Sequence, residues 1–302
     1  MARYLYKNGN STVIINSVDG TKERITEDDD FDLAFPETID INCTTFCTGG
    51  CPFCYAECSP YGKHAELMGQ KFIDTLHPYT EVALQVNDLT HPELIDFLQK
   101  LKKRKIFANI TVNQIHFQQK EEFIKRLVDA DLVKGIGISL MNPTQDFIMK
   151  VKKYPNAVIH TINGILKASD IEALRDQNLK VLILGYKNKG RGVQYFNDNE
   201  VNIVARQRYL YDVLATLPSH FKVLSFDNLA LEQLDVKRIL SPQQWEEIYL
   251  GDEGTSSMFI DLVSGKFGVS SLCVESEMHP LLDNIKDMFQ IVKKDAGKMR
   301  RG

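Results

Sequence analysis

Three cysteines, Cys47, Cys51 and Cys54, stand close together in the run CTGGCPFC. Their C-x3-C-x2-C spacing folds a short loop around one small object and presents three sulfurs to it. A structural zinc ion takes four ligands, whereas a cubane iron–sulfur cluster held by three cysteines keeps one iron open for a ligand that is not protein. The spacing therefore predicts a [4Fe–4S] cluster with one open iron.

A zinc site is the alternative interpretation of these thiols. It would combine Cys51 and Cys54 with Cys43, Cys47 or Cys58, because a short CxxC pair also occurs in zinc-binding proteins. This alternative describes a metal-binding protein without turnover.

Three further cysteines, Cys43, Cys58 and Cys273, are enough in number for a second cluster. Because two of the three lack the spacing of metal ligands, we do not expect a second cluster, and we expect these cysteines to be small buried thiols. Cys58 lies just beyond the loop and is a candidate hydrogen-atom donor or cross-link site, which makes it a candidate catalytic residue.

Composition limits the classes of protein. The chain has 302 residues, of which 43% are hydrophobic and 25% charged, as in a soluble globular protein with a sizeable core. The net charge of −4 gives no strong signal for nucleic-acid binding. No apolar stretch reaches the length of a membrane span, no signal peptide is recognised, and crowded cysteines suit a reducing compartment. We expect a cytoplasmic protein without a membrane partner.

The order of apolar runs predicts an α/β fold. Residues 1–36 form a β-rich lead-in with turns at Asn8-Gly9 and Asp19-Gly20. Six strands are expected at Thr38–Asn42, Glu81–Val86, Ile106–Val112, Gly135–Leu140, Ala157–Ile162 and Val181–Gly185. Helices are expected at His64–Leu76, His91–Lys103, Lys120–Ala130, Thr144–Lys153, Ser169–Gln177 and Val201–Leu217. Such alternation predicts right-handed βαβ units and a parallel sheet, with the active site at the carboxyl ends of the strands.

Residues 37–217 are expected to form this catalytic part, and residues 218–302 a C-terminal extension packed on it. The extension shows a strand pattern at Lys222–Asp227 and a hairpin pattern formed by Met258–Leu262 and Gly268–Cys273 around Ser264-Gly265.

The cysteine motif and the strand pattern together resemble the radical S-adenosylmethionine (radical SAM) superfamily over about residues 38–192. The phrases SPYGKHAEL, TVNQIHF and GYKNKGRG look most like radical SAM proteins of phage and prophage origin. The resemblance implies a partial (β/α)6 TIM-like barrel, and it implies S-adenosylmethionine (SAM) as the ligand of the open iron.

The resemblance also implies roles for single residues. Cys47, Cys51 and Cys54 match the cluster ligands, and Phe53 matches the aromatic position beside the adenine of SAM. Asn87 stands where the family carries Gly-Gly-Glu, whose backbone meets the methionine amino group. Ser139 matches a polar position that contacts the ribose or carboxylate. The remaining candidates for SAM binding are Asn163, at the tip of the fifth strand, and Lys187 and Arg191, in the loop after the sixth.

Other polar residues near the strand ends have competing interpretations. His64 is a candidate catalytic residue, whereas His91 is expected to begin a helix. Lys187 and Arg191 either bind a SAM carboxylate or a substrate phosphate, or belong to a solvated loop. Tyr55 and Tyr186 either relay a radical or pack.

By resemblance, a low-potential electron donor of the flavodoxin or ferredoxin type reduces the cluster. SAM is then cleaved to methionine and a 5′-deoxyadenosyl radical, which abstracts hydrogen from the substrate. The substrate is expected to be a peptide or protein, or a small molecule, with a nucleotide or nucleobase as the alternative.

Overall fold

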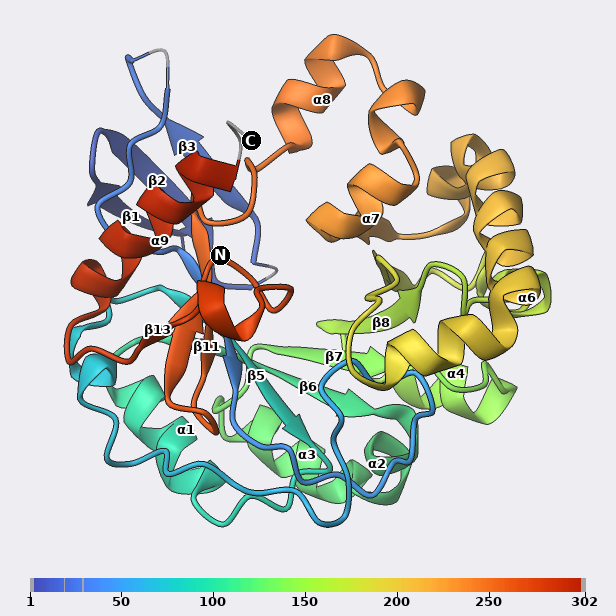
Figure 1. Cartoon of the computed structure of the whole chain (residues 1–302), viewed down its shortest axis with the longest axis horizontal. Coiled ribbons are helices and arrows are strands. Elements are labelled where there is room, and N and C mark those ends of the chain that lie inside the picture. Colours follow the sequence, from blue (N-terminus) through green and yellow to red (C-terminus); the bar gives the residue numbers. More distant parts are fainter. Residues whose placement is uncertain (1–2, 19, 29, 300–302) are drawn as a thin grey trace.

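The chain forms one large curved sheet, with helices on its outer side, and a small N-terminal sheet (Figure 1). The computed structural model describes residues 3–18, 20–28 and 30–299. The large sheet has the strand order β10-β9-β8-β7-β6-β5-β4-β11-β12-β13. Its strands are β4 (Thr38–Asn42), β5 (Glu81–Asn87), β6 (Phe107–Asn113), β7 (Gly135–Ser139), β8 (Ala157–Ile162), β9 (Lys180–Leu184), β10 (Val223–Phe226), β11 (Ser257–Asp261), β12 (Lys266–Gly268) and β13 (His279–Pro280).

Strands β4 to β10 are parallel and follow one another in chain order, as expected for consecutive βαβ units. Strand β11 pairs in parallel with the other edge of β4, and β12 and β13 continue antiparallel. Within the described residues, β10 and β13 are the two edges, so the sheet is curved but not closed. The predicted α/β fold with a partial TIM-like barrel is confirmed.

The helices arise from apolar residues at helical spacing. In the first, Leu94, Phe97, Leu98 and Leu101 recur at intervals of three and four and are all buried against the sheet. The α-helices are α1 (Leu94–Lys103), α2 (Gln114–Gln119), α3 (Glu121–Asp129), α4 (Gln145–Val151), α5 (Ala168–Leu174), α6 (Arg191–Val213), α7 (Asn228–Gln233), α8 (Pro242–Ile248) and α9 (Ile285–Met299). Short 3-10 helices are η1 (Lys71–Thr75), η2 (Leu214–His220), η3 (Val236–Ile239) and η4 (Glu275–Glu277).

The two faces of the large sheet differ in polarity. Ile39 and Ile41 of β4 and Ile159 of β8 are buried and belong to the main hydrophobic core. Asp40 lies between Ile39 and Ile41, and His160 follows Ile159. Because successive side chains of a strand alternate, Asp40 and His160 point to the opposite, inner face of the sheet. The sheet therefore presents polar side chains on its inner face.

The N-terminal sheet, of β1 (Arg3–Asn8), β2 (Ser11–Asn16) and β3 (Lys22–Ile25), is antiparallel in that order. The predicted Asn8-Gly9 turn joins β1 to β2. The second predicted turn includes Asp19, which lies outside the described residues. The β-rich lead-in is thus a three-stranded sheet.

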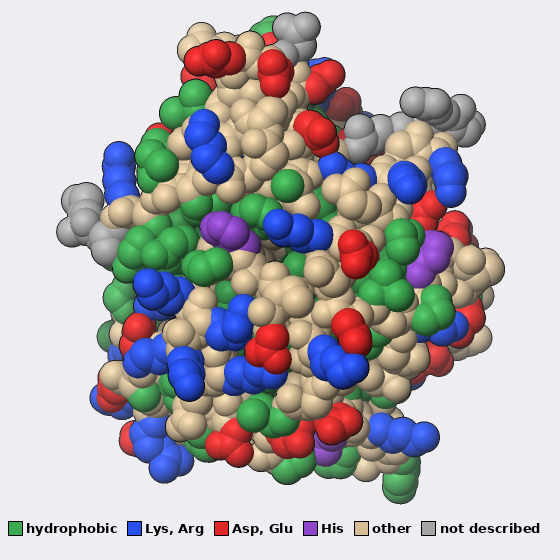
Figure 2. All heavy atoms as spheres, turned by 90° about the vertical axis from the view of Figure 1, so that its left-hand side faces the viewer, with side chains coloured by type: hydrophobic (Ala, Val, Ile, Leu, Met, Phe, Trp, Pro, Cys, Tyr) green, Lys and Arg blue, Asp and Glu red, His purple; other side chains and the backbone are tan. Residues whose placement is uncertain are grey.

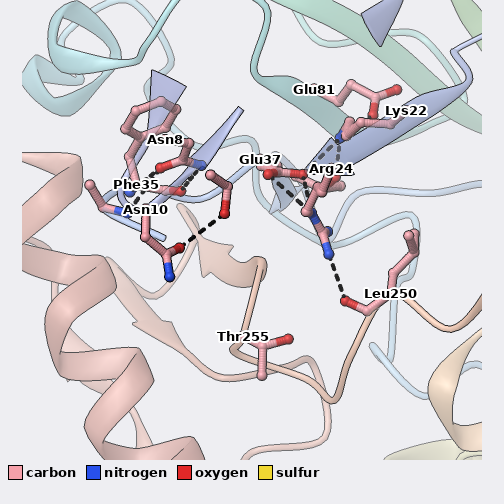
Figure 3. Close-up of polar contacts among 12 residues, drawn as sticks. Asn8, Asn10, Lys22, Arg24, Phe35, Glu37, Glu81, Leu250 and Thr255 are labelled. Atoms are coloured by element: carbon pink, nitrogen blue, oxygen red, sulfur yellow. Dashed lines mark hydrogen bonds and ion pairs between the residues drawn. The ribbon is translucent and has the colours of Figure 1, made fainter. Parts of the chain in front are cut away.

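Buried polar contacts attach this small sheet to the large one (Figure 3). Arg24 donates from Nε to both carboxylate oxygens of Glu37, at 3.1 and 3.0 Å, and from Nη1 to the carbonyl oxygen of Leu250. Lys22 lies 2.8 Å from Glu81 and 3.8 Å from Glu37. The Glu37 side chain is only 1% exposed, so these charges form a buried network between the two sheets.

Three sequence-based expectations need correction. The helix expected at Val201–Leu217 is α6, which begins at Arg191 and ends at Val213, where the 3-10 helix η2 follows. Residues His64–Leu76 were expected to be helical, but only Lys71–Thr75 form a short 3-10 helix, η1. The segment before it is extended, because Ala65 N donates to Cys43 O and the Glu93 carboxylate accepts from Leu67 N. The second hairpin strand was expected at Gly268–Cys273, but β12 is Lys266–Gly268.

The outer surface mixes charges of both signs. Figure 2 shows Lys, Arg, Asp and Glu side chains interspersed over the face that carries the N-terminal sheet and α9. No helix in the described part of the chain is both long enough and apolar enough to cross a membrane.

Candidate functional site

The three-cysteine loop leaves the carboxyl end of β4 and is closed on itself by backbone pairing. Isolated β-bridges join Thr44 to His64 and Phe46 to Ser59. A Cβ atom at Gly62 would lie 2.0 Å from the carbonyl oxygen of Thr45, so only glycine fits where the two arms of the loop meet. The position at the strand end agrees with the expected place of an active site in a parallel sheet.

Cys47, Cys51 and Cys54 are half-buried, and two of their sulfurs accept hydrogen bonds from neighbouring groups. Gly49 N–H donates to Cys47 Sγ at 3.3 Å, and Asn113 Nδ2 at the end of β6 donates to Cys51 Sγ at 3.3 Å. These donors favour the thiolate forms that bind metal. The structure brings the three predicted ligands together in one loop.

The thiols interact electrostatically. Burial raises the pKa of Cys47 and Cys51, and the negative charge of Cys54 raises both further. A hydrogen bond from the Cys58 thiol lowers the pKa of Cys54 to about 6, and the same contact raises the pKa of Cys58. The surroundings therefore favour the thiolate form of Cys54, which is the form that binds metal, and disfavour the thiolate form of Cys58.

Arg191, the first residue of α6, holds the loop from the other side. Its guanidinium donates to the carbonyl oxygens of Cys51 and Cys58, at 3.0 Å from Nη2 in each case, and its backbone N–H donates to Cys54 O. The positive charge favours the thiolates of all three predicted ligands. Arg191 therefore braces the cysteine loop, a role that the sequence did not predict.

Asn87 ends β5 with a backbone φ of +49°, next to a register shift between β5 and β6. Its Nδ2 donates to the carbonyl oxygens of Thr44 and Phe46, at 3.1 and 2.9 Å, and to Cys58 Sγ at 3.4 Å. These contacts use the amide hydrogens, and among the described residues no donor is found for Oδ1, which can therefore accept from a ligand. An ammonium group is a donor and matches such an oxygen.

The other predicted SAM contacts lie at neighbouring strand ends. Phe53 packs edge-on against Tyr195 of α6, with ring centroids 5.6 Å apart. Ser139 ends β7 and is half-buried. Asn163 is fully buried after β8, and it donates to Gln233 of α7 at 3.1 Å while its Oδ1 has no partner among the described residues.

Lys187 lies between the loop after β9 and the C-terminal part of the chain. Its Nζ is 2.7 Å from Ser271 Oγ and 4.2 Å from the centre of the Tyr55 ring. Tyr55 itself donates to Gln85 Oε1 at 3.1 Å, and Tyr186 donates to Gly192 O at 2.7 Å. Lys187 is therefore part of the packed site and not of a solvated loop.

His64 and Cys58, the two candidate catalytic residues, both contact the cysteine loop. His64 Nδ1 lies 2.9 Å from Thr44 Oγ1, and its ring packs against Phe46 and His91. Cys58 is 5% exposed and accepts hydrogen bonds from Asn87 and Gln85. His64 supports the loop, and Cys58 adjoins the predicted ligands.

Polar residues of the inner face were missed by sequence reasoning. Asp40 is accessible to water, yet protein surrounds it closely enough that burial raises its pKa, a combination typical of a group facing an internal recess. Burial and the charge of Asp40 raise the pKa of Glu253 to about 7, and burial lowers the pKa of His160 to about 4. The positive charge of Lys187 acts in the opposite direction and favours the charged forms of the Asp40 and Glu253 carboxylates. The sequence signal that could have indicated Asp40 and His160 is a polar residue between apolar neighbours in a strand, as in TIDIN and VIHTI.

The arrangement of the three thiols suits a cluster better than a single metal ion. Among the described residues, no three His, Cys, Asp or Glu side chains surround a point where a single metal ion could be held. A cubane spreads three thiolates over three iron atoms, so its ligands stand further apart than those of one ion. Convergent half-buried thiols, N–H donors to sulfur and the nearby guanidinium of Arg191 fit such a cluster.

Comparisons with known proteins show similarity to solved structures. No family model matches the chain, and no curated protein matches it in sequence. The crystal structure of Streptococcus suis SuiB bound to S-adenosylmethionine is similar with a TM-score of 0.61 and 11% identity. A second crystal structure of SuiB gives a TM-score of 0.63, also at 11% identity. Each match covers 99% of this chain and 89% of the other. The chain therefore shares its fold with a protein that binds S-adenosylmethionine.

Proposed function

We propose that the protein is a radical SAM enzyme. The observation that carries the proposal is the convergence of Cys47, Cys51 and Cys54 at the carboxyl end of β4, in a fold shared with SAM-bound SuiB. A [4Fe–4S] cluster bound there supplies an electron for reductive cleavage of SAM to methionine and a 5′-deoxyadenosyl radical.

The protein's own residues hold and shield the reactants. Cys47, Cys51 and Cys54 bind the cluster, while Gly49 N–H and Asn113 donate to two of their sulfurs. Arg191 fixes the loop through its carbonyl oxygens and balances the negative charge of the thiolates.

Binding of SAM uses groups that the loop contacts leave available. Asn87 Oδ1 accepts from the methionine ammonium, and Phe53 packs beside the adenine. Ser139, Asn163 and Lys187 complete the polar lining at the ends of the next strands. When SAM is bound, these residues would hold it at the carboxyl ends of the strands, with its reactive end near the proposed cluster ligands.

We propose a peptide or protein as the substrate. Burial raises the pKa of Asp40 and of Glu253 on the inner side, so further negative charge from a phosphate is disfavoured there, whereas carboxyl groups accept hydrogen bonds from amide and ammonium donors. Their presence favours a peptide over the alternative nucleotide. The chemistry that bound SAM would supply is abstraction of a hydrogen atom from a carbon of this substrate, with 5′-deoxyadenosine as the product.

The electron comes from a partner. We propose a flavodoxin or ferredoxin of low potential, because no other redox group is implied by the sequence. We place the protein in the cytoplasm, since six free cysteines, five of them from Cys43 to Cys58, require a reducing compartment.

The test is anaerobic reconstitution with iron and sulfide, followed by dithionite and SAM. We expect about four irons per chain and release of 5′-deoxyadenosine. Replacing the three predicted ligands by alanine should abolish both the cluster absorbance and the product. Cys273→Ala is the matched control, because this buried thiol lies after β12 and is not a predicted ligand.

Two outcomes would contradict the proposal. Formation of 5′-deoxyadenosine by the triple alanine variant would show that other residues hold the cluster. Stoichiometric zinc in the purified protein, with no cluster after reconstitution, would favour the metal-binding alternative.

A further inference from the structure

Thr48 lies in the three-cysteine loop, between Cys47 and Gly49, and its hydroxyl contacts two buried side chains. Its Oγ1 is 2.9 Å from Nε2 of His116, the third residue of α2, and 3.4 Å from Oδ2 of Asp88, which directly follows β5. His116 is 3% exposed and Asp88 is 2% exposed. The loop is therefore held at Thr48 by side chains that follow two neighbouring strands, β5 and β6.

The hydrogen bonds of Thr48 form a chain with one direction. A carboxylate only accepts, so the single hydroxyl hydrogen of Thr48 goes to Asp88, and Oγ1 accepts from Nε2–H of His116. Nδ1 of His116 is buried without a partner among the described residues, so the ring makes its hydrogen bond through Nε2. At the other end, Asp88 Oδ1 accepts from N and Oγ1 of Thr90, at 3.2 and 2.6 Å. Such a chain strengthens its members, because each hydrogen bond polarises the next.

The first turn of α2 is fixed on the same loop. Asn113 caps this helix with Oδ1, which accepts from Ile115 N at 2.9 Å, while its Nδ2 donates to Cys51 Sγ at 3.3 Å. One turn of helix thus contacts the loop at two points, Cys51 and Thr48. His116 therefore has little freedom to move away from Thr48.

The position of Thr48 sets the direction of the N–H of Gly49, which donates to Cys47 Sγ at 3.3 Å. The peptide plane that carries this N–H joins Thr48 to Gly49, so a fixed Thr48 also fixes the N–H. A Cβ atom at Gly49 would lie 3.4 Å from both Cys47 Sγ and Cε1 of His116. The backbone at Gly49 is thus packed between the sulfur and the imidazole ring.

We propose that Thr48 is a positioning residue for the cluster, held in place by His116 and Asp88. With Thr48 fixed, the N–H of Gly49 stays directed at Cys47 Sγ and raises the reduction potential of the cluster. The reduced cluster carries one more negative charge than the oxidised cluster, so a donor to a ligand sulfur stabilises the reduced form more. The inference rests on the proposed function, because it needs Cys47 as a cluster ligand.

The first experiment measures the midpoint potential of the reconstituted cluster, by a redox titration that follows the EPR signal of the reduced form. Thr48→Val removes the hydroxyl and keeps the shape of the side chain, and His116→Leu removes the ring N–H. Each should shift the one-electron equilibrium about threefold toward the oxidised form, which is about 30 mV downward at about 59 mV per tenfold change. Thr48→Ser retains a hydroxyl and His116→Gln retains an N–H donor, so both should shift the potential less.

Thr161→Val is the matched control. It removes the hydroxyl of a buried threonine in β8, which donates to Leu182 O of β9 at 3.3 Å, away from the cysteine loop. The potential of this variant should equal that of the wild type. Iron content should equal that of the wild type in all variants, and the His116 pair decides the matter if Thr48→Val binds no cluster.

The second experiment is a double-mutant cycle on the protein without iron, measured by urea unfolding. Thr48→Val and His116→Leu should each raise the unfolding equilibrium constant about fivefold. The combined variant should raise it by less than the product of the two effects, because both substitutions remove the same hydrogen bond. This measurement does not depend on a cluster.

The possible failures are distinguishable. An unchanged potential in Thr48→Val and His116→Leu, with full iron content, would overturn the inference and leave the proposed function intact. An equal loss of potential in Thr48→Ser or His116→Gln would also overturn it, because the retained hydrogen bond would then have no effect. Independent effects in the urea cycle would remove the contact on which the inference stands. Absence of a cluster in the wild type would instead refute the proposed function, even where the urea cycle shows the contact.

Discussion

Asn87 occupies a backbone conformation that asparagine adopts more readily than most side chains, with a φ of +49°. In this conformation its amide NH2 faces the cysteine loop and its oxygen remains for a ligand. Asn87 thus supports the cysteine loop through its amide NH2 and, by our proposal, binds SAM through its amide oxygen.

Two substitutions separate these roles. Asn87→Gly tolerates the positive φ but removes the oxygen, whereas Asn87→Asp keeps an acceptor and loses the donor. We expect the glycine variant to weaken SAM binding by about 1–2 kcal/mol, roughly 5- to 30-fold in Kd, and the aspartate variant to weaken it less. Calorimetry on the cluster-loaded protein measures the difference. Equal affinities of wild type and Asn87→Gly would show that another group binds the ammonium.

His160 predicts a pH dependence of stability. Burial on the inner face lowers its pKa to about 4, against 6.5 in an unfolded chain. Between these values the unfolded chain binds more protons, so the free energy of unfolding is at its full value above pH 6.5 and falls as the pH drops toward 4. Urea unfolding should show a loss of at most about 3 kcal/mol from this residue. The loss should be absent in His160→Gln.

The difference between the two proteins should be constant above pH 6.5, which serves as the internal control. If their stabilities fall in parallel from pH 6.5 to 4, His160 is protonated in the folded protein as readily as in the unfolded chain.

At the scale of elements, Glu37 links β3 of the small sheet to the start of β4. Its carboxylate contacts Arg24 and Lys22 in surroundings closed to water. Glu37→Gln keeps the shape and removes the charge, so two buried cations lose their shared partner. We expect a loss of about 3 kcal/mol in the free energy of unfolding, measured in urea.

Glu23→Gln is the control, because Glu23 is an exposed carboxylate on β3, the strand that carries Lys22 and Arg24. It should change the stability by no more than about 0.5 kcal/mol. A Glu37→Gln protein as stable as this control would mean that the buried network contributes nothing net to the attachment of the small sheet.

The strands could be predicted from the sequence because their pattern is local. In β4 and β8, apolar residues alternate with polar ones, and the predicted bounds match the observed bounds. The prediction of a His64–Leu76 helix was wrong because Leu67, Phe72, Ile73 and Leu76 imitate helical spacing, whereas tertiary contacts bury them although only Lys71–Thr75 are helical, in the short 3-10 helix η1. Such contacts depend on partners distant in sequence.

The same distinction applies to the site. The three proposed ligands follow from spacing within one loop. The contacts of Arg191 with Cys51 and Cys58 span more than a hundred residues, and the proximity of Asp40 to Glu253 depends on the curvature of the sheet. No local pattern encodes these distances, so they could not be predicted.

At the scale of the molecule, the C-terminal segment completes the sheet at both edges. Strand β10 extends the β9 edge, and β11 lies against β4 on the side away from β5. One hydrophobic core includes Leu33 and Ile41 near the start of the chain and Met258 and Phe289 near its end. Folding of the catalytic part therefore draws on nearly the whole sequence.

The pairing of β4 with β11 has a consequence for biosynthesis. Asn42 and Asp261, which share a hydrogen bond of 2.9 Å, are 219 residues apart. At about 5–20 residues per second, a ribosome needs on the order of ten to forty seconds to make the chain between them. During that interval β4 and the cysteine loop that follows it have been made, but β11, the second strand that pairs with β4, has not. We therefore expect the machinery that delivers iron and sulfide to act on the finished chain, after its release from the ribosome.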